Sequence, residues 1–372
     1  MSIRSIFFFF LLFFLGFFFY QFVYVSQNPH IPSSVQKQKK PVHILIISSW
    51  RSGSSFLGQI FNHHQDVFYL FEPGHSIWMR FRKEGATLLH YLVRDLIHSL
   101  FTCDVSSLQQ YLPRGGKQIS EMSFFSESRA LCSPPSCSGY IPSGGFDRQK
   151  CFYRCKNATL DKMAEACTKY SHVVMKTVRI FDLSVLLPLF RDPALDLRIL
   201  HLVRDPRAVA SSRKYFSLSV DDRIVLKGFI GNNNIASTQV MEKICNAQLA
   251  INKLAMAAVP VLHDRYMLIR HEDLALEPVK NVKDIYEFVG LKMSDDMERW
   301  IHNITHGEDK EKRGFMTFSR QSSKVVQKWR TTMDFKNVKE IQHVCKDAME
   351  HFGYLPVKSI KEQKNMTLDL IL

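Results

Sequence analysis

The chain has 372 residues, 46% of them hydrophobic, which is enough to bury a sizeable core in one large domain or two ordinary ones. Its formal net charge of +14 favours anionic ligands. Nucleic acid would also suit this charge, but zinc-finger, RNP and helix-turn-helix patterns are missing from the sequence, so we expect no nucleic-acid partner.

An apolar segment near the N-terminus predicts a membrane anchor. Residues 6–25 carry no charge and include ten Phe, and about twenty apolar residues are enough for a helix to cross a bilayer. The segment is longer than the apolar core of a signal peptide and ends in VYVSQN, without a small-x-small cleavage site. We therefore expect a cytosolic tail at 1–5, an uncleaved transmembrane signal anchor at 6–25, a polar stem at 26–41 and a luminal domain at 42–372.

Sequons and cysteines indicate the orientation of this anchor, which its flanking charges leave undecided. Three N-glycosylation sequons, at Asn157, Asn303 and Asn365, follow the anchor, as do all eight cysteines. Five of the cysteines fall between Cys132 and Cys167, which is dense for a cytosolic enzyme. We expect a type II membrane protein with its domain in an oxidising lumen. Eight cysteines allow 105 disulfide pairings, and the choice among them stays open.

The first candidate site is a strand followed by a loop and a helix start. Val42 to Ile47 is apolar apart from one His and predicts a buried strand, and the loop SSWRSGSSF follows it. A helix is expected to begin near Ser54. Backbone N–H groups around Arg51 would form an anion-binding nest there, with the hydroxyl groups of Ser54 and Ser55 as extra donors. A nucleotide-triphosphatase loop would need a Lys after the Gly. An ordinary strand-to-helix turn is the alternative.

A second basic junction has the same form. Leu197 to Val203 predicts another buried strand, after which RDPRAVASSRK begins a helix with Asp205 as its cap and Pro206 in its first turn. The basic and hydroxyl side chains of this junction are Arg204, Arg207, Ser211, Ser212 and Arg213. Two junctions of this kind suit one ligand that carries two separated anionic groups.

Strand and helix patterns alternate along the rest of the domain, which implies a parallel α/β sheet flanked by helices. Further strands are expected at residues 67–71, 173–175 and 266–270, and helices at 88–101, 278–289 and 338–352. Residues 102–168 are irregular and are expected to be held by disulfides. Ligands of parallel sheets bind beyond the carboxyl ends of the strands, where Arg51, Glu72, Lys176 and Arg204 would lie.

Taken together, the motifs resemble one family. WRSGSSF and LVRDPRAV, with YLFEP, CSPPSC, HVVMKTVR, WIHNITHG and SSKVVQKWR, are similar to the Golgi carbohydrate 6-O-sulfotransferases, and most of all to their N-acetylglucosamine branch. The resemblance implies a P-loop-like sulfotransferase fold, a Golgi membrane location and 3′-phosphoadenosine 5′-phosphosulfate as co-substrate. The first motif would hold the 5′-phosphosulfate and the second the 3′-phosphate. The implied contacts are Ser49, Trp50, Arg51, Ser52, Gly53, Ser54, Ser55, Leu202, Val203, Arg204, Asp205, Pro206, Arg207, Ala208, Val209, Ala210 and Ser212.

Three residues are expected to carry the reaction. Sulfuryl transfer needs a group that accepts the proton of the attacking hydroxyl, and positive charge around the sulfate and the leaving phosphate. Glu72 is the candidate base, because it follows a short strand and the likeness to related sulfotransferases places a glutamate at this spacing. Lys176 is the candidate for stabilising the leaving oxygen, and Arg51 completes the set. An exposed Glu and a surface Lys are the structural alternatives.

The expected acceptor is the 6-hydroxyl of N-acetylglucosamine, or of a related hexose, in a glycoprotein or keratan-type glycan. The alternatives are a galactose or N-acetylgalactosamine acceptor, or a catalytically inactive, membrane-anchored glycan-binding protein of the same fold. The expected partner is the glycoprotein or proteoglycan that carries the acceptor, and a homodimer is left open. His302 and His306 lack a third ligand nearby, so no metal is expected. The basic segment 314–330 is expected to fold over the cofactor.

Overall fold

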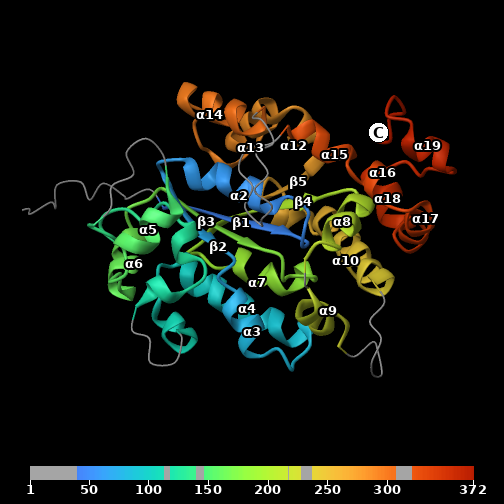
Figure 1. Cartoon of the computed structure of the whole chain (residues 1–372). Coiled ribbons are helices and arrows are strands. Elements are labelled where there is room, and N and C mark those ends of the chain that lie inside the picture. Colours follow the sequence, from blue (N-terminus) through green and yellow to red (C-terminus); the bar gives the residue numbers. More distant parts are fainter. Residues whose placement is uncertain (1–39, 113–117, 140–145, 217, 228–236, 307–320) are drawn as a thin grey trace, which may run out of the picture. The chain divides into compact units, whose positions relative to one another are not determined.

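The computed structural model describes residues 40–112, 118–139, 146–216, 218–227, 237–306 and 321–372 (Figure 1). Within them, Pro41–Leu372 form one compact unit. The expected cytosolic tail and membrane anchor lie outside the described residues, as do nearly all of the stem and the first part of segment 314–330. No helix in the described part of the chain is long and apolar enough to cross a bilayer.

A five-stranded parallel sheet forms the centre of this unit. The strands, in the spatial order β2-β3-β1-β4-β5, are β2 (Val67–Phe71), β3 (His172–Thr177), β1 (Val42–Ser48), β4 (Asp196–Val203) and β5 (Tyr266–Arg270). Every residue of β1 is buried, as expected for a central strand with helices on both faces. The predicted parallel sheet flanked by helices is therefore confirmed.

Helices cover the sheet and form the connections between its strands. The α-helices are α2 (Ser54–His63), α3 (His75–Arg80), α4 (Ala86–Phe101), α5 (Arg148–Arg154), α6 (Leu160–Cys167), α7 (Leu187–Phe190), α8 (Pro206–Arg213), α9 (Ser219–Leu226), α10 (Ser237–Ala257), α11 (Val259–Leu262), α12 (His271–Leu276), α13 (Pro278–Val289), α14 (Asp295–Thr305), α15 (Ser322–Gln327), α16 (Trp329–Thr332), α17 (Phe335–Val344), α18 (Lys346–Phe352) and α19 (Ile360–Lys364). Short 3-10 helices lie at Ser106–Tyr111, Ile119–Glu121, Phe125–Glu127 and Leu183–Leu186.

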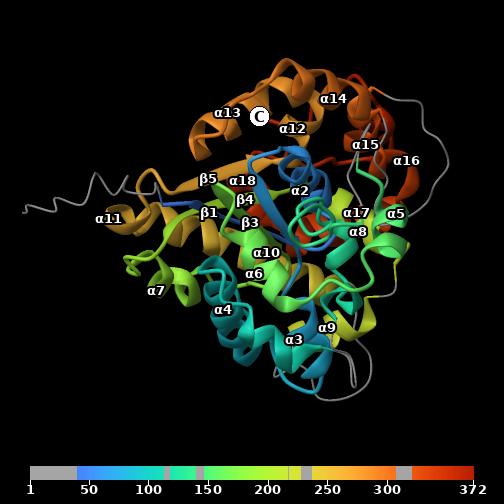
Figure 2. The same cartoon turned by 90° about the vertical axis from the view of Figure 1, so that its left-hand side faces the viewer.

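The two faces of the sheet carry separate helical layers (Figures 1 and 2). Helices α12, α13 and α14 lie on one face, and α3, α4, α7 and α9 lie on the other. Successive side chains of a strand point to opposite faces. Ile44 of β1 accordingly joins a core with Leu57 of α2 and Ile285 of α13, whereas its neighbour Leu45 joins a core with Val93 of α4. The sheet is thus closed on both faces, and its strand ends are where polar side chains gather.

Two of the predicted helices show what local sequence signals could decide. Helix α13 begins at Pro278 and stops at Gly290, whose φ of 77° is the left-handed conformation of a glycine C-cap. The single helix predicted at 338–352 is wrong. The chain forms α17 and α18 instead, with Cys345 outside helical geometry between them and joined to Cys245 of α10 by a disulfide. Gly353 still ends the second helix, as predicted.

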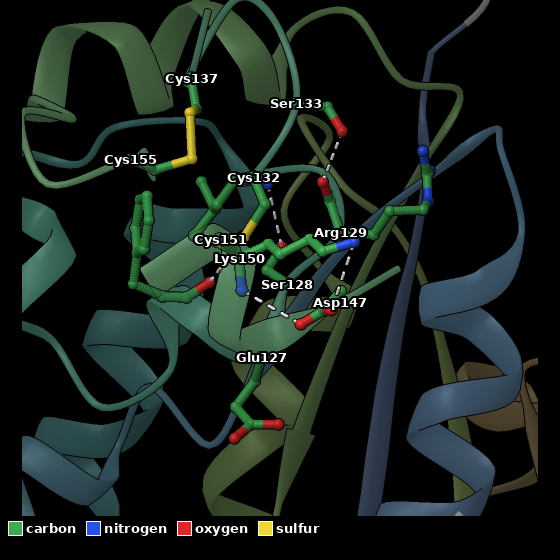
Figure 3. Close-up of a disulfide and its surroundings, with 12 residues drawn as sticks. Glu127, Ser128, Arg129, Cys132, Ser133, Cys137, Asp147, Lys150, Cys151 and Cys155 are labelled. Carbon is green, nitrogen blue, oxygen red and sulfur yellow. Dashed lines mark hydrogen bonds and ion pairs between the residues drawn. A yellow bond between two sulfur atoms is a disulfide. The ribbon is translucent and has the colours of Figure 1, made fainter. Parts of the chain in front are cut away.

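Disulfides hold the irregular segment together, and Arg129 joins it to the helix that follows the first loop. The four disulfides join Cys103 to Cys167, Cys132 to Cys151, Cys137 to Cys155 and Cys245 to Cys345. The first three lie within segment 102–168, as predicted. Figure 3 shows two of them beside Arg129. The Arg129 guanidinium donates to the carbonyl oxygens of Asn62 (3.0 Å) and His64 (2.9 Å). A cation at this end of α2 complements the helix dipole, so the disulfide-linked segment holds the helix that follows the first loop.

Candidate active site

The two basic junctions meet at the point where the order of the strands along the sheet reverses. From β1 the chain crosses to one side of the sheet, and from β4 it crosses to the other, which makes the space between β1 and β4 a topological switch point. Ser48, the last residue of β1, pairs in register with Leu202 of β4. The loops that begin at Ser49 and at Arg204 therefore leave the sheet side by side.

The first loop has the geometry of an anion nest. Gly53 has a φ of 88° and caps α2, which begins at Ser54 as predicted. Arg51 also has a positive φ, 72°, a conformation that costs a non-glycine residue free energy and that concentrates at functional sites. The hydroxyl groups of Ser49 and Ser52 are 2.6 Å apart and brace the loop from inside. The first backbone N–H groups of α2 have no partner within the helix, so this loop end can bind an oxyanion.

Two hydrogen bonds tie the junctions together. Arg51 Nε donates to the hydroxyl oxygen of Ser212 in α8 (3.0 Å), and its guanidinium lies 3.7 Å from the ring centroid of Phe216. Arg204 Nη1 donates to the backbone carbonyl of Arg51 (2.8 Å), and Arg204 Nη2 donates to the carbonyl of Val325 in α15 (3.3 Å). The structure thus brings together Arg51, Arg204 and Ser212, which the sequence placed at one site, and adds α15 to them.

Several residues expected to contact the cofactor are buried within the fold. Arg207 is fully buried, its guanidinium lies 4.2 Å from the Trp329 ring centroid, and it donates to Asp205, Gln342 and the carbonyl of Leu355. Arg207 therefore supports the packing of α8, in place of the ligand contact expected from the sequence. The other residues of this motif with 4% exposure or less are Leu202, Val203, Asp205, Ala208, Val209 and Ala210. Pro206 is buried too, so these positions could face a ligand only through their backbone.

The start of α8 rests on a buried carboxylate that the sequence analysis did not single out. Glu272 accepts hydrogen bonds from the backbone N–H of Asp205 (3.1 Å) and from the Tyr354 hydroxyl (2.9 Å). Burial, and after it the charge of Asp205, raise the pKa of Glu272 to about 7. Glu272 lies two residues beyond β5, so the only sequence signal for it was its place at the same edge of the sheet.

Glu72 and Lys176 form an ion pair at the ends of neighbouring strands. Lys176 Nζ lies 2.5 Å from Glu72 Oε1, and Arg179 holds the other carboxylate oxygen. Burial alone would raise the pKa of Glu72, but the charges of Lys176 and then Arg179 outweigh it and lower the pKa to about 2. Glu72 has a φ of 47°, and its backbone N–H donates to the carbonyl of Lys176 (3.1 Å). Glu72 is therefore ionised and held by both its backbone and its side chain.

Lys176 stands between this carboxylate and the first loop. Its Nζ donates to the hydroxyl oxygen of Ser55 (3.5 Å) and lies 4.1 Å from the ring centroid of Phe71. The side chain is 2% exposed, and burial lowers its pKa, while the charge of Glu72 acts in the opposite direction. Strand β3 lies between β1 and β2 in the sheet, so its Lys is the residue that can reach both the anion nest and the candidate base.

A buried histidine lies against the first loop. A Cβ atom on Gly53 would fall 2.3 Å from Nδ1 of His271, so only glycine fits that position. Both ring nitrogens of His271 are buried and have no hydrogen-bond partner among the described residues. Burial, and after it the charge of Arg204, lower the pKa of His271 well below its usual value. A neutral imidazole with an unused donor and an unused acceptor at this position suits a site that binds a polar ligand.

Other residues from the sequence analysis lie away from this edge. The three sequon asparagines, Asn157, Asn303 and Asn365, are exposed. The imidazole rings of His302 and His306 stack with their centroids 4.2 Å apart near the end of α14. Arg179, which pairs with Glu72, was quoted only as part of a motif, because nothing in the local sequence showed that its side chain returns to the end of β2.

The family comparison defines the class of the domain, whose two basic junctions have just been described, as a sulfotransferase domain. The family model described as "Sulfotransferase domain" matches residues 41–353. The chain is 44% identical to human carbohydrate sulfotransferase 6 over 92% of its own length and 88% of that protein's. It is 39% identical to mouse carbohydrate sulfotransferase 4 over 94% of its own length and 91% of the other's. The chain belongs to the carbohydrate sulfotransferase family.

Solved structures match more distantly. The sulfotransferase domain of the curacin biosynthetic pathway is 16% identical to this chain, covers 83% of it and is itself covered to 98%, with a TM-score of 0.45. A mouse sulfotransferase complexed with PAP is 10% identical, with 83% of this chain and 85% of that one covered and a TM-score of 0.38.

Proposed function

We propose that the protein transfers a sulfuryl group from 3′-phosphoadenosine 5′-phosphosulfate to the 6-hydroxyl of N-acetylglucosamine, or of a related hexose, in glycoprotein or keratan-type glycans. The observation that carries the proposal is the contact between the two basic junctions, Arg204 to the Arg51 carbonyl at 2.8 Å. A donor with a phosphosulfate at one end and a phosphate at the other needs two anion sites close together. These two meet at the switch point of a parallel sheet.

The residues present suit that donor. The nest at Gly53 and the hydroxyl groups of Ser54 and Ser55 would bind the phosphosulfate end, and Arg204 with Ser212 would bind the other phosphate. His271, with both ring nitrogens unused beside Gly53, supports a polar ligand at this position. The donor supplies the sulfuryl group and the leaving phosphate. The protein's task is to place and polarise them.

Glu72 would accept the proton of the attacking hydroxyl. Its carboxylate is ionised and fixed, which suits a base, but a pKa of about 2 makes it a weak one while both Lys176 and Arg179 hold it. Lys176 already contacts Ser55 of the donor loop at 3.5 Å. If Lys176 turns its charge to the leaving oxygen, Glu72 keeps one cation instead of two and its pKa rises. Donor binding would in this way strengthen the base.

The finer parts of the proposal rest on the likeness to the family. The N-acetylglucosamine 6-hydroxyl is preferred because the sequence motifs, taken in order, are most similar to that branch. The expected Golgi location and type II orientation rest on residues 6–25 and on the three sequons after them. Acceptance of galactose or N-acetylgalactosamine would leave the donor site and the base unchanged.

The test is an assay of the purified protein with donor labelled in its sulfate, offered glycans that end in N-acetylglucosamine, galactose or N-acetylgalactosamine. Label on carbon 6 of N-acetylglucosamine is the expected result. Label on galactose or N-acetylgalactosamine alone would correct the acceptor. If no glycan is labelled although adenosine 3′,5′-bisphosphate binds, and the unlabelled glycans bind to the protein, the protein is an inactive glycan-binding member of the fold.

A further inference from the structure

We propose that Arg179 is a positioning residue for this transfer: it holds the Glu72 carboxylate in place when Lys176 engages the donor, and it ties that carboxylate to Asp221 of α9. The inference rests on the proposed function, in which Glu72 is the base and Lys176 moves its charge toward the leaving group.

The two cations on Glu72 are placed for different tasks. Lys176 binds one carboxylate oxygen and also contacts Ser55 of the donor loop. Arg179 binds the other oxygen, and among the described residues its side chain has no hydrogen bond to the hydroxyl groups of that loop. When the donor draws Lys176, Arg179 is the cation that stays with Glu72. Because the carboxylate must keep its orientation while it receives a proton, the remaining partner determines the geometry of the attack.

Arg179 is itself held rigidly. Its side chain is 4% exposed and its guanidinium lies 5.6 Å from the Trp50 ring and 5.9 Å from the Trp78 ring. Its backbone N–H donates to the Thr177 hydroxyl oxygen (3.2 Å) directly after β3. Cation–π contacts of this kind hold a guanidinium plane in one orientation. Arg179 can therefore hold the Glu72 carboxylate in one orientation, because its own side chain is held in place.

The second carboxylate on this guanidinium is Asp221. Its Oδ1 lies 3.7 Å from Arg179 Nη2, is buried, and has no hydrogen-bond partner among the described residues. Burial raises the pKa of Asp221, and the charge of Glu72 acts in the same direction. A planar guanidinium can bridge two carboxylates, which a lysine ammonium cannot do with fixed geometry. The position of α9 is thereby coupled to the orientation of the base.

Other ionisable groups also face Glu72 and enter the pH behaviour. They are Lys176 of β3, His75 of α3, Tyr69 of β2, and Asp221 of α9. Burial, and after it the charge of Arg179, lower the pKa of His75, so this residue is neutral near pH 7. Arg179 is the second cation on Glu72, and its removal takes away a positive charge while the contact between Lys176 and the Ser55 hydroxyl of the donor loop remains.

The experiment measures turnover, the Kd of adenosine 3′,5′-bisphosphate and the pH dependence of kcat at saturating donor and acceptor in Arg179→Gln, Arg179→Lys, Asp221→Asn and Glu72→Gln. Arg198→Gln is the matched control, because Arg198 pairs with Asp196 (3.7 Å) near the amino end of β4, at the opposite end of that strand from the candidate site. Circular dichroism and thermal melting establish that each variant is folded. Activity is followed from about pH 4 to about pH 9, since kcat reports the ionisations of the substrate-bound enzyme, in which Lys176 has turned to the donor.

Arg179→Gln should lower turnover by about 10²-fold, with the Kd of the bisphosphate within about threefold of wild type. The acid limb of kcat should move to higher pH, because with Lys176 drawn to the donor Glu72 loses its remaining cation. Arg179→Lys keeps the positive charge but loses the planar guanidinium, so the acid limb of its pH profile should stay near that of wild type. Its turnover should be only partly recovered. Asp221→Asn should not move the limb upward, because it removes a negative neighbour of Glu72.

Each other outcome has a defined meaning. An acid limb in Arg179→Gln that coincides with those of wild type and Arg198→Gln would overturn the positioning role and leave Arg179 a packing residue. If Arg179→Gln does not fold, Arg179→Lys serves as the test, and full activity in that variant would overturn the proposal. Undiminished turnover in Glu72→Gln would remove the base assignment in the proposed function. Loss of turnover in Glu72→Gln with normal turnover in Arg179→Gln would overturn this inference alone.

Discussion

The guanidinium of Arg204 donates to the backbone carbonyl of Arg51 at 2.8 Å, across two loops that are 153 residues apart in the chain. The contact exists because β1 and β4 are neighbours in a parallel sheet, which places the carboxyl ends of both strands at one edge. The binding of a donor to one loop therefore affects the other loop as well.

Arg51→Ala and Arg204→Ala should each weaken the binding of adenosine 3′,5′-bisphosphate. A lost charge-assisted hydrogen bond costs about 1.5–3 kcal/mol, which is roughly tenfold to more than a hundredfold in affinity. Calorimetry measures the effect, with Arg299→Ala as control because Arg299 is exposed on α14 and pairs with Asp296 of the same helix. Unchanged affinity in either variant would show that its junction has a structural role only.

Glu72→Gln should lower turnover by roughly 10²- to 10⁴-fold, because the amide keeps the size of the side chain but cannot accept a proton. The Kd of the bisphosphate should change little. Glu121→Gln is the control: Glu121 is exposed in the 3-10 helix at Ile119–Glu121. Steady-state kinetics at saturating donor and acceptor decide the matter. A loss that appears in Glu121→Gln and not in Glu72→Gln would move the base to Glu121.

Glu272 should make stability depend on pH. Its pKa is raised from 4.5 to about 7, so the folded protein binds more protons than the unfolded chain between these two values. The free energy of unfolding should therefore fall as pH rises through this range, by at most about 3 kcal/mol at 1.36 kcal/mol per pH unit. Urea unfolding of wild type and Glu272→Gln at about pH 4.5 and about pH 8 isolates this contribution. A difference between the two proteins that is the same at both pH values would contradict the assignment.

The disulfide between Cys245 and Cys345 should stabilise the fold more than a disulfide that closes a short segment of the chain. It closes a segment of 100 residues, and loop-closure entropy predicts about 4–5 kcal/mol for this length. Denaturant unfolding of the Cys245→Ser, Cys345→Ser double variant measures the loss. The matched comparison is Cys137→Ser, Cys155→Ser, in which the closed segment is 18 residues and about 3 kcal/mol is expected. Equal losses in the two double variants would argue against the entropic explanation.

Asn157, Asn303 and Asn365 should carry glycans when the full chain is made in cells that glycosylate secreted proteins, since all three are exposed. Glycosidase digestion should lower the apparent mass. Replacing each Asn by Gln in turn should remove one increment. Absence of any mass change, together with cysteines that react with a thiol reagent without prior reduction, would contradict a luminal domain.

The sequence alone was sufficient for the elements that local chemistry determines. Apolar β-branched runs predicted all five strands, and the Pro278 and Gly290 signals predicted both ends of α13, because these preferences act over a few neighbouring residues. The two basic junctions could be predicted from the sequence for the same reason. Backbone amides at the start of a helix and an arginine beside them are a local arrangement.

Only the tertiary structure decided which of these residues work together. The spatial strand order placed Lys176 between the donor loop and Glu72, turned Arg207 inward under Trp329, and returned Arg179 to the carboxylate of Glu72. The same packing placed His271 against Gly53 and divided the helix predicted at 338–352 at Cys345. These contacts join residues tens to hundreds of positions apart, and burial and partner charges set their protonation. Periodicity and turn signals contain neither kind of information, because both depend on which distant segments the folded chain brings together.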